Sequence, residues 1–222
     1  MLRKTNRPSK DRIKDRLRHV FGLAEPRHIA AGKLWYTEAH EFALAVADAT
    51  GVPIGRVCGV IAALSPSVRW GDNKRQAEAL CQAYAEGEDL LNVVVTTYGR
   101  QAVKAREILS PDKYVGWSLE GALGKRAFKT TAFFHNIRSP RTSRSVTIDQ
   151  HIVAAAGLID IWTTGAQWCY DRVSKAIREL AEEKGLRPCQ VQAIVWITWK
   201  DIVLPDDKRS NWNEAQDEPA PF

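Results

Sequence analysis

The apolar positions of this chain recur mostly at the three- and four-residue spacing of amphipathic helices, with proline and glycine between the segments. Only the run 91–96 (LNVVVT) could pass for a strand, and one isolated strand does not form a sheet. We therefore predict an all-α fold. The expected helices span 10–21, 27–50, 54–64, 72–85, 101–109, 117–123, 126–136, 166–184 and 190–203, and a further helix begins at Asp149.

Two of these segments, 54–64 and 190–203, are apolar on nearly every side, which is typical of helices buried in a core. The length of 222 residues and the 45% hydrophobic content suit one domain with a real core, which can be bilobed. No uncharged apolar run approaches the roughly 18 to 20 residues of a membrane span, and the N-terminus lacks the apolar stretch of a signal peptide. We expect a cytoplasmic protein with no membrane partner.

The cysteines show no CxxC pair and no spacing typical of a secreted protein, so they are expected to be reduced thiols. They are Cys58, Cys81, Cys169 and Cys189. A structural zinc or iron–sulfur site is not expected with this spacing, and we predict no metal and no cofactor.

The net charge of +6 is unevenly distributed. Residues 1–20 hold eight Lys or Arg and two Asp, so this segment alone accounts for +6, and the remainder is balanced at 24 to 24. Between Glu120 and Asp149 lie six further Lys or Arg and no acid. Clustered cations suit a polyanion such as DNA, whereas the alternative is a solvated basic tail. We define 1–22 as a basic N-terminal arm and the polar, acidic segment 205–222 as a C-terminal tail.

Lys129 and Asp149 lie twenty residues apart, each near the expected start of a helix. A helix N-terminus carries partial positive charge, which favours an ionised carboxylate and disfavours protonation of a nearby amine. These are the states of a nucleophile and its electrostatic partner. The alternatives are an N-cap role for Asp149 and an ordinary surface position for Lys129.

Four blocks of sequence resemble, in order and spacing, the helix-hairpin-helix (HhH-GPD) DNA glycosylases typified by endonuclease III. The first block is VCGVIAALSPSVRWGDNKRQAEAL, and the second is TTYGRQAVKAREIL, with Lys104 and Ala105. The third, LEGALGKRAFKTTA, stands at the place of the hairpin and its lysine. The fourth, VTIDQHI, has an aspartate two residues before a histidine. A divergent phage-type member of the superfamily is one form of this resemblance.

The resemblance implies two helical lobes with a central DNA-binding cleft within a domain of residues 23–204. One lobe would combine 27–64 with 160–204, and the other, 72–158, would carry the hairpin and the catalytic pair. The hairpin departs from the usual leucine-proline-glycine-any-glycine turn, because Gly121 and Gly124 flank Ala122 and Leu123 and the proline is missing. The glutamine that often fills the gap left by a flipped base is also missing around Ser67 and Val68.

The resemblance also implies roles for individual residues. Asp149 would stabilise the oxocarbenium-like transition state, and Lys129 would be the nucleophile, with Lys125, directly after the glycine turn, as the alternative. The residues implied in DNA binding are Gly121, Gly124, Arg126, Asn73, Lys74, Arg138 and Arg141, and those in the base pocket are Trp70, Ser65 and His151. Structural alternatives are core packing for Trp70, a helix cap for Asn73, and a satisfied structural position for His151.

The implied function is that of a monomeric DNA glycosylase, which flips a damaged or modified base out of the stack and cleaves its N-glycosidic bond. An attacking lysine would add Schiff-base lyase activity, whereas an attacking water would release the base alone. Two alternatives stay open. One is a transferase of the same fold that modifies a thymine-derived base in phage DNA, and the other is a non-catalytic helical DNA-binding protein.

Overall fold

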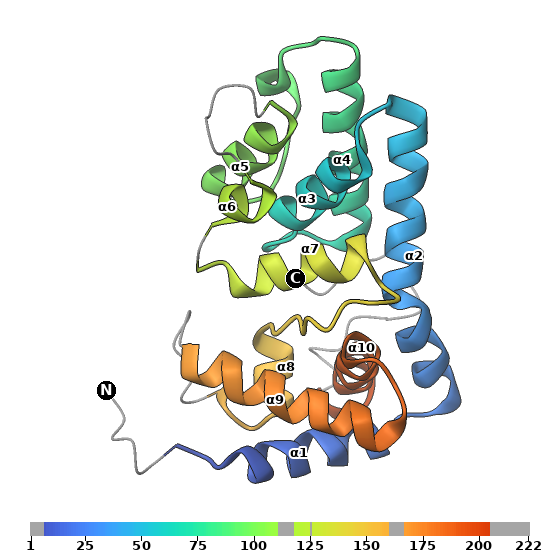
Figure 1. The fold of residues 1–222 in the computed structure, drawn as a ribbon, viewed down its shortest axis with the longest axis vertical. Coiled ribbons are helices and arrows are strands. Elements are labelled where there is room, and N and C mark those ends of the chain that lie inside the picture. The colour runs from blue at the N-terminus through green and yellow to red at the C-terminus, as the bar shows by residue number, and fades with distance from the viewer. Residues whose placement is uncertain (1–6, 111–117, 125, 160–166, 205–222) are drawn as a thin grey trace. The chain divides into compact units, whose positions relative to one another are not determined.

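The computed structural model describes residues 7–110, 118–124, 126–159 and 167–204, and in these ranges the chain is helical without any β-strand (Figure 1). The predicted all-α class is confirmed. The strand-like run 91–96 instead contains part of the short 3-10 helix η2 (Leu90–Asn92). The candidate Lys125 and the tail 205–222 lie outside the described residues.

The helix boundaries follow the sequence pattern closely. They are α1 (Lys10–Gly22), α2 (Pro26–Thr50), α3 (Ile54–Leu64), α4 (Trp70–Ala85), α5 (Gly99–Leu109), α6 (Leu119–Leu123), α7 (Phe128–Arg138), α8 (Gln150–Ala155), α9 (Gln167–Lys184), α10 (Pro188–Thr198) and the π-helical turn η5 (Trp199–Val203). The segment predicted as one helix over 190–203 thus changes from α-helix to π-helix at Trp199.

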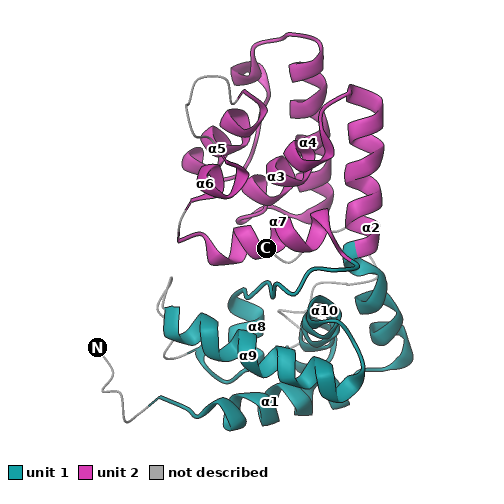
Figure 2. Cartoon of the chain, viewed as in Figure 1, with its two compact units in different colours: residues 1–36, 141–212 teal, residues 37–140, 213–222 magenta. Residues whose placement is uncertain are grey.

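The described chain divides into two compact units (Figure 2). Residues up to Tyr36 and from Arg141 onward belong to unit 1, and Thr37–Pro140 belongs to unit 2. The division falls within α2 and again after α7. The expected lobe 72–158 therefore contributes residues 72–140 to unit 2 and residues 141–158 to unit 1.

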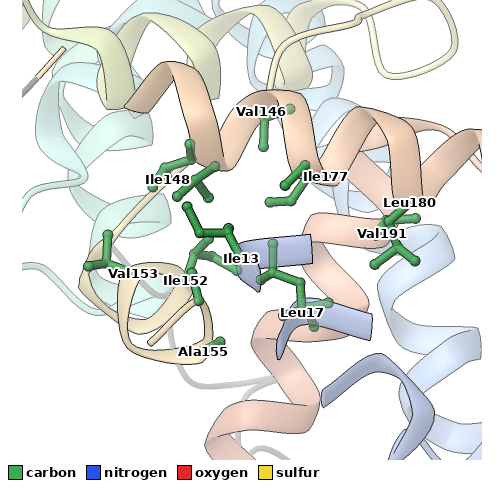
Figure 3. Packing of buried hydrophobic residues seen from close by; sticks show 14 of the residues in the cluster. Ile13, Leu17, Val146, Ile148, Ile152, Val153, Ala155, Ile177, Leu180 and Val191 are labelled. Carbon is green, nitrogen blue, oxygen red and sulfur yellow. The ribbon is translucent and has the colours of Figure 1, made fainter. Parts of the chain in front are cut away.

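The core of unit 1 is formed by apolar side chains from α1, α8, α9, α10 and the segment before α8 (Figure 3). Its fully buried members include Ile13, Ile152 and Ile177. The crossing of α2 and α10 is close, because a Cβ built at Gly32 would lie 2.7 Å from the backbone nitrogen of Ile194 and 2.8 Å from its Cα. Only glycine at position 32 permits this approach.

Helix α1 is part of unit 1 and not a free arm. Its stripe of Ile13, Leu17 and Val20 is buried in the core. The ammonium of Lys14 lies 3.2 Å from a Glu179 carboxylate oxygen and 3.1 Å from one of Glu183. Lys10 and Arg18 extend this ladder to Glu179 and Glu183, at 2.7 and 2.9 Å. The predicted arm 1–22 is therefore wrong for residues 10–22, because the apolar stripe and the acids of α9 hold them.

The core of unit 2 surrounds α3. Every residue from Val57 to Leu64 is buried, and α3 contacts α4, α5, α6 and α7. This confirms the prediction of a buried helix over 54–64. The approach of α6 is close, because a Cβ built at Gly59 would lie 2.6 Å from Cδ2 of Leu119.

The four cysteines are buried thiols. Burial raises the pKa of Cys58 and of Cys81 to about 12, which disfavours the reactive thiolate. In the part of the chain that the structure describes, no helix is both long and apolar enough to cross a membrane.

Replacement of Gly32 by alanine should destabilise unit 1. Alanine is favoured over glycine in a helix by about 1 kcal/mol, but here its methyl group overlaps backbone atoms of α10, and overpacking of this kind costs typically about 1–3 kcal/mol or more. We expect a net loss in the free energy of unfolding, measured by urea denaturation. The control is Gly22→Ala, since a Cβ at Gly22 meets no atom within 4 Å. A Gly32→Ala protein as stable as this control would contradict the close crossing.

The attachment of α1 should depend on pH. Hydrogen bonds lower the carboxyl pKa of Glu179, chiefly through Lys10, and of Glu183, chiefly through Arg18, from the ordinary value of 4.5. Groups with lowered pKa values stabilise the folded state above their ordinary pKa, and this contribution is lost as pH falls through the lowered value. Amide hydrogen exchange in α1 should therefore accelerate relative to α3 below about pH 4.5. A Glu179→Gln/Glu183→Gln variant should lack this dependence, and an unchanged pH profile in that variant would refute the assignment.

Candidate functional site

Asp149 is the only aspartate or glutamate among the buried side chains of the described residues, with 4% of its surface exposed. It is the N-cap of α8, where Oδ1 accepts a hydrogen bond of 2.8 Å from the backbone N–H of Ile152. Its other oxygen, Oδ2, accepts one of 3.1 Å from Nε1–H of Trp196 on α10. The N-cap interpretation of Asp149 is confirmed, and the second bond fixes the plane of the carboxylate as well.

A buried hydrogen-bond network holds the chain just before Asp149. The hydroxyl of Tyr36 lies 2.7 Å from Oε1 of Gln192 and 3.0 Å from Oγ1 of Thr147, and all three side chains are buried. Because an amide oxygen only accepts, the Tyr36 proton goes to Gln192 and the Thr147 hydroxyl donates to Tyr36. Tyr36 thereby connects Thr147 to α10. Asp149, two residues further along the chain, contacts α10 directly.

The contacting residues are similarly spaced along α10 and along the segment that leads to Asp149. Gln192 and Trp196 are one α-helical i,i+4 step apart, about 6 Å along α10. Thr147 and Asp149 are two residues apart, which is at most about 6.6 Å along an extended chain, and Asp149 itself is extended. The two spacings are similar, so Trp196 reaches Asp149 directly and Gln192 reaches Thr147 through Tyr36.

Lys200 continues the same row by one further step of four residues, and we call Gln192, Trp196 and Lys200 the α10 row. The ammonium of Lys200 lies 4.6 Å from the centroid of the Trp196 ring. The ring of His151 meets Trp196 edge-on at 6.2 Å between centroids. His151 and Lys200 are both partly exposed. Trp196 thus connects the buried carboxylate to two cationic or titratable groups at the surface.

The π-helical turn that carries Lys200 is anchored by a buried histidine. Nδ1 of His28 accepts a hydrogen bond of 3.0 Å from the backbone N–H of Glu25, so its proton is on Nε2, which donates to Asp201 at 2.9 Å. Arg27 donates to the same Asp201 oxygen at 2.8 Å. π-Helical turns are rare and often occur at functional sites. The anchor at Asp201 fixes the position of the adjacent Lys200.

Lys129 is the second residue of α7, and it is partly buried. Both members of the expected pair are therefore at the start of a helix, as predicted. Lys129 belongs to unit 2 and Asp149 to unit 1. The catalytic pairing of the two stays a prediction.

The glycine turn after α6 uses its own amides. Gly121 N–H donates to Oγ of Ser118, the N-cap of α6, and Gly124 N–H donates to the carbonyls of Glu120 and Gly121. Both amides are thus hydrogen-bonded within the turn, and the DNA-binding role expected of Gly121 and Gly124 stays a prediction. Gly124 has φ +106, a conformation that favours glycine. Arg126, by contrast, is exposed.

Lys104 of α5 holds this turn and was not predicted to do so. Its amine donates a hydrogen bond of 2.6 Å to the carbonyl of Leu123, and a Cβ at Gly124 would lie 3.3 Å from Nζ. Burial, and then the nearby charge of Arg100, lower the pKa of Lys104. The sequence signal was present, since Lys104 belongs to the second of the four blocks, but spacing alone does not reveal its partner.

The expected pocket residues of unit 2 lie in the core. Trp70 is 8% exposed, and its ring contacts those of Phe42 and Phe133 edge-on, at 6.2 and 6.4 Å. The buried Ser65 hydroxyl donates to the carbonyl of Ala62. Trp70 therefore fits the alternative of core packing, and Ser65 holds the end of α3.

The DNA-binding candidates differ in exposure. Asn73 is fully buried, and its amide donates to the carbonyl of Ile61, so its predicted contact with DNA is wrong. The ammonium of Lys74 lies 5.7 Å from the Phe42 ring and 5.8 Å from the Trp70 ring. Arg138 and Arg141, around the end of α7, are exposed, as is Arg126, so these arginines remain accessible.

One loop residue has a strained backbone. Ser67, between α3 and α4, has φ +60, and no other non-glycine residue in the described ranges has a positive φ. Its hydroxyl donates a hydrogen bond of 2.7 Å to the hydroxyl of Tyr98, a residue that is 63% exposed. The loop where the resemblance expected a glutamine thus presents an aromatic ring held by Ser67. The described residues contain no group of His, Cys, Asp and Glu that could hold a metal ion.

A family model matches residues 1–202, which include every element from α1 to α10 and the α10 row. The chain belongs to the family of unknown function DUF7178. No curated protein and no solved structure matches it. Membership of DUF7178 therefore assigns no activity to the chain.

The bond between Asp149 and Trp196 can be tested by a double-mutant cycle. Asn is as good an N-cap as Asp. In Asp149→Asn, however, the amide oxygen accepts from Ile152, so the NH2 group faces the indole N–H, which then has no acceptor. Trp196→Phe removes the indole donor. Each variant should lose about 1–3 kcal/mol in the free energy of unfolding. The double variant should lose less than the sum by about 1 kcal/mol or more. Additive losses would show that the bond does not contribute.

Proposed function

We propose that this DUF7178 protein is a glycosylase-like enzyme that binds DNA, flips a damaged or modified base, and cleaves the N-glycosidic bond with Asp149 as the essential carboxylate. The observation that carries this proposal is the geometry of Asp149. A buried carboxylate carries a desolvation cost that capping α8 alone does not require, because an asparagine or serine would cap α8 equally well.

The held carboxylate suits the chemistry. As the glycosidic bond breaks, positive charge develops on the sugar, and a group whose orientation is already fixed stabilises that charge without reorganisation. An ionised carboxylate has about four acceptor sites, of which the bonds from Ile152 and Trp196 occupy two. The remaining sites are what a sugar or an attacking water would face.

The four blocks that resemble the HhH-GPD glycosylases fall on consecutive elements. The first covers α3, the loop with Ser67, and α4. The second covers α5, the third covers α6 and the start of α7, and the fourth leads into α8. This order supports the proposed two-lobed glycosylase arrangement, with α6 and α7 as its hairpin and with DNA as the partner of a monomer.

Lys129 is the proposed nucleophile. A neutral amine that attacks C1′ of the sugar displaces the base with the bonding electron pair, and loss of the amine protons with opening of the sugar ring gives an imine. Elimination from this imine breaks the strand. If water attacks instead, the base is released and an abasic site remains.

Borohydride trapping distinguishes these routes. The protein is incubated with duplex and single-stranded DNA carrying a panel of modified bases, and parallel samples are treated with alkali. A trapped adduct that is lost in Lys129→Ala but kept in the control Lys175→Ala, an exposed lysine of α9, indicates the lyase route. Alkali-labile sites without trapping indicate the water route. Asp149→Asn should lower either product by about 100-fold or more.

The same samples also show which result would refute base excision. DNA that is bound but shows neither adduct nor alkali-labile site with any base would refute base excision. Mass spectrometry of the digested nucleosides, after incubation with amine and amino-acid donors, would then identify a group-transfer product or leave a binding protein as the remaining alternative.

A further inference from the structure

Helix α1 carries two rows of cationic side chains, on opposite sides of its buried stripe. Lys10, Lys14 and Arg18 form the row that pairs with Glu179 and Glu183 of α9. At 3.6 residues per turn, Arg12 and Arg16 fall on the other side of the stripe. Both are exposed, and neither forms an ion pair with another described residue.

Two further guanidinium groups gather at the beginning of α1. The Cζ atoms of Arg7 and Arg172 lie 4.6 and 5.8 Å from the ring centroid of Trp168 on α9. Arg172 also donates a hydrogen bond of 2.6 Å to the carbonyl of Pro8. Neither arginine has a carboxylate partner among the described residues. The contacts with Trp168 and Pro8 hold both guanidinium groups near the beginning of α1.

The other end of the exposed row lies on the turn after α8. A Cβ built at Gly157, whose φ is +70, would lie 2.5–2.8 Å from Cδ, Nε and Cζ of Arg16. The side chain of Arg16 therefore lies flat against the bare Cα of Gly157, at the end of the short helix that Asp149 begins. A cation is favoured at a helix C-terminus, which helps to hold Arg16 there.

We propose that Arg12 and Arg16, with Arg7 and Arg172 at the beginning of α1, bind the phosphates of the DNA backbone. Guanidinium groups bind phosphate oxygens in a bidentate manner, and contacts of this kind position DNA without reading its sequence. Four such groups without carboxylate partners need counter-charge, whereas the row of Lys10, Lys14 and Arg18 already has it. This inference rests on the DNA-binding part of the proposed function and does not depend on base excision.

The test compares two variants with the same change in charge. Arg12→Gln/Arg16→Gln removes two cations from the exposed row, and Lys10→Gln/Lys14→Gln removes two from the paired row. Binding to an unmodified duplex is measured by fluorescence anisotropy at several salt concentrations, with circular dichroism to confirm folding. Each phosphate contact contributes about 0.9 to the slope of log K against log salt. The exposed-row variant should therefore lose about 1.8 in slope, and the paired-row variant should keep the slope and lose thermal stability.

Equal loss of slope in both variants would mean that only net charge matters, and an unchanged slope in the exposed-row variant would mean that these arginines do not meet phosphate. Either result overturns the proposal, as does a wild-type protein that does not bind the duplex. A vesicle of anionic phospholipid and an acidic polypeptide serve as alternative anions, and preference of the exposed row for either over DNA also overturns it. Because the duplex has no modified base, a protein that excises nothing can still meet the prediction.

Discussion

The site depends on two connections between α10 and the chain leading into α8, one direct and one through Tyr36 of α2. Gln192 binds Thr147 through the Tyr36 hydroxyl, and Trp196 binds Asp149 and borders His151. A helix rises about 6 Å in four residues and an extended chain advances about 6.6 Å in two. A shift of one residue in the segment would turn Thr147 and Asp149 away from α10 and leave buried polar groups without partners, so the register is strongly determined.

The helices could be predicted because their signals are local. Pro53 before α3, and Ser65 and Pro66 after it, define that helix to the residue, and its lack of a polar face identifies it as core. The helix expected over 126–136 begins two residues later, because Ala127 N–H closes a turn onto the carbonyl of Gly124 before α7 starts. Boundaries of this kind depend on turn geometry that the apolar period does not contain.

The candidate site was predictable only in part, for the same reason. The N-cap role of Asp149 follows from its place before an apolar helix, but its bond to Trp196 joins residues 47 apart in sequence and requires the tertiary fold. A signal did exist, since Gln192 and Lys200 flank Trp196 at intervals of four in a segment that is mostly apolar. Asn73 shows the opposite case, in which a polar residue that suggested a surface contact satisfies a buried carbonyl.

Charge is the property that the sequence describes least well, because a count of Lys and Arg contains no information on which of them are already neutralised. The positive segment 1–20 includes three cations that pair with Glu179 and Glu183, so this part of its charge stabilises the fold and has little attraction left for a polyanion. Arg12 and Arg16 keep theirs. The buried stripe between the rows separates the two uses: the turns of α1 that bury Ile13 and Leu17 direct one set of cations to α9 and the other to solvent. A single amphipathic helix can therefore serve the core and an anionic partner at once, and its net charge predicts neither role.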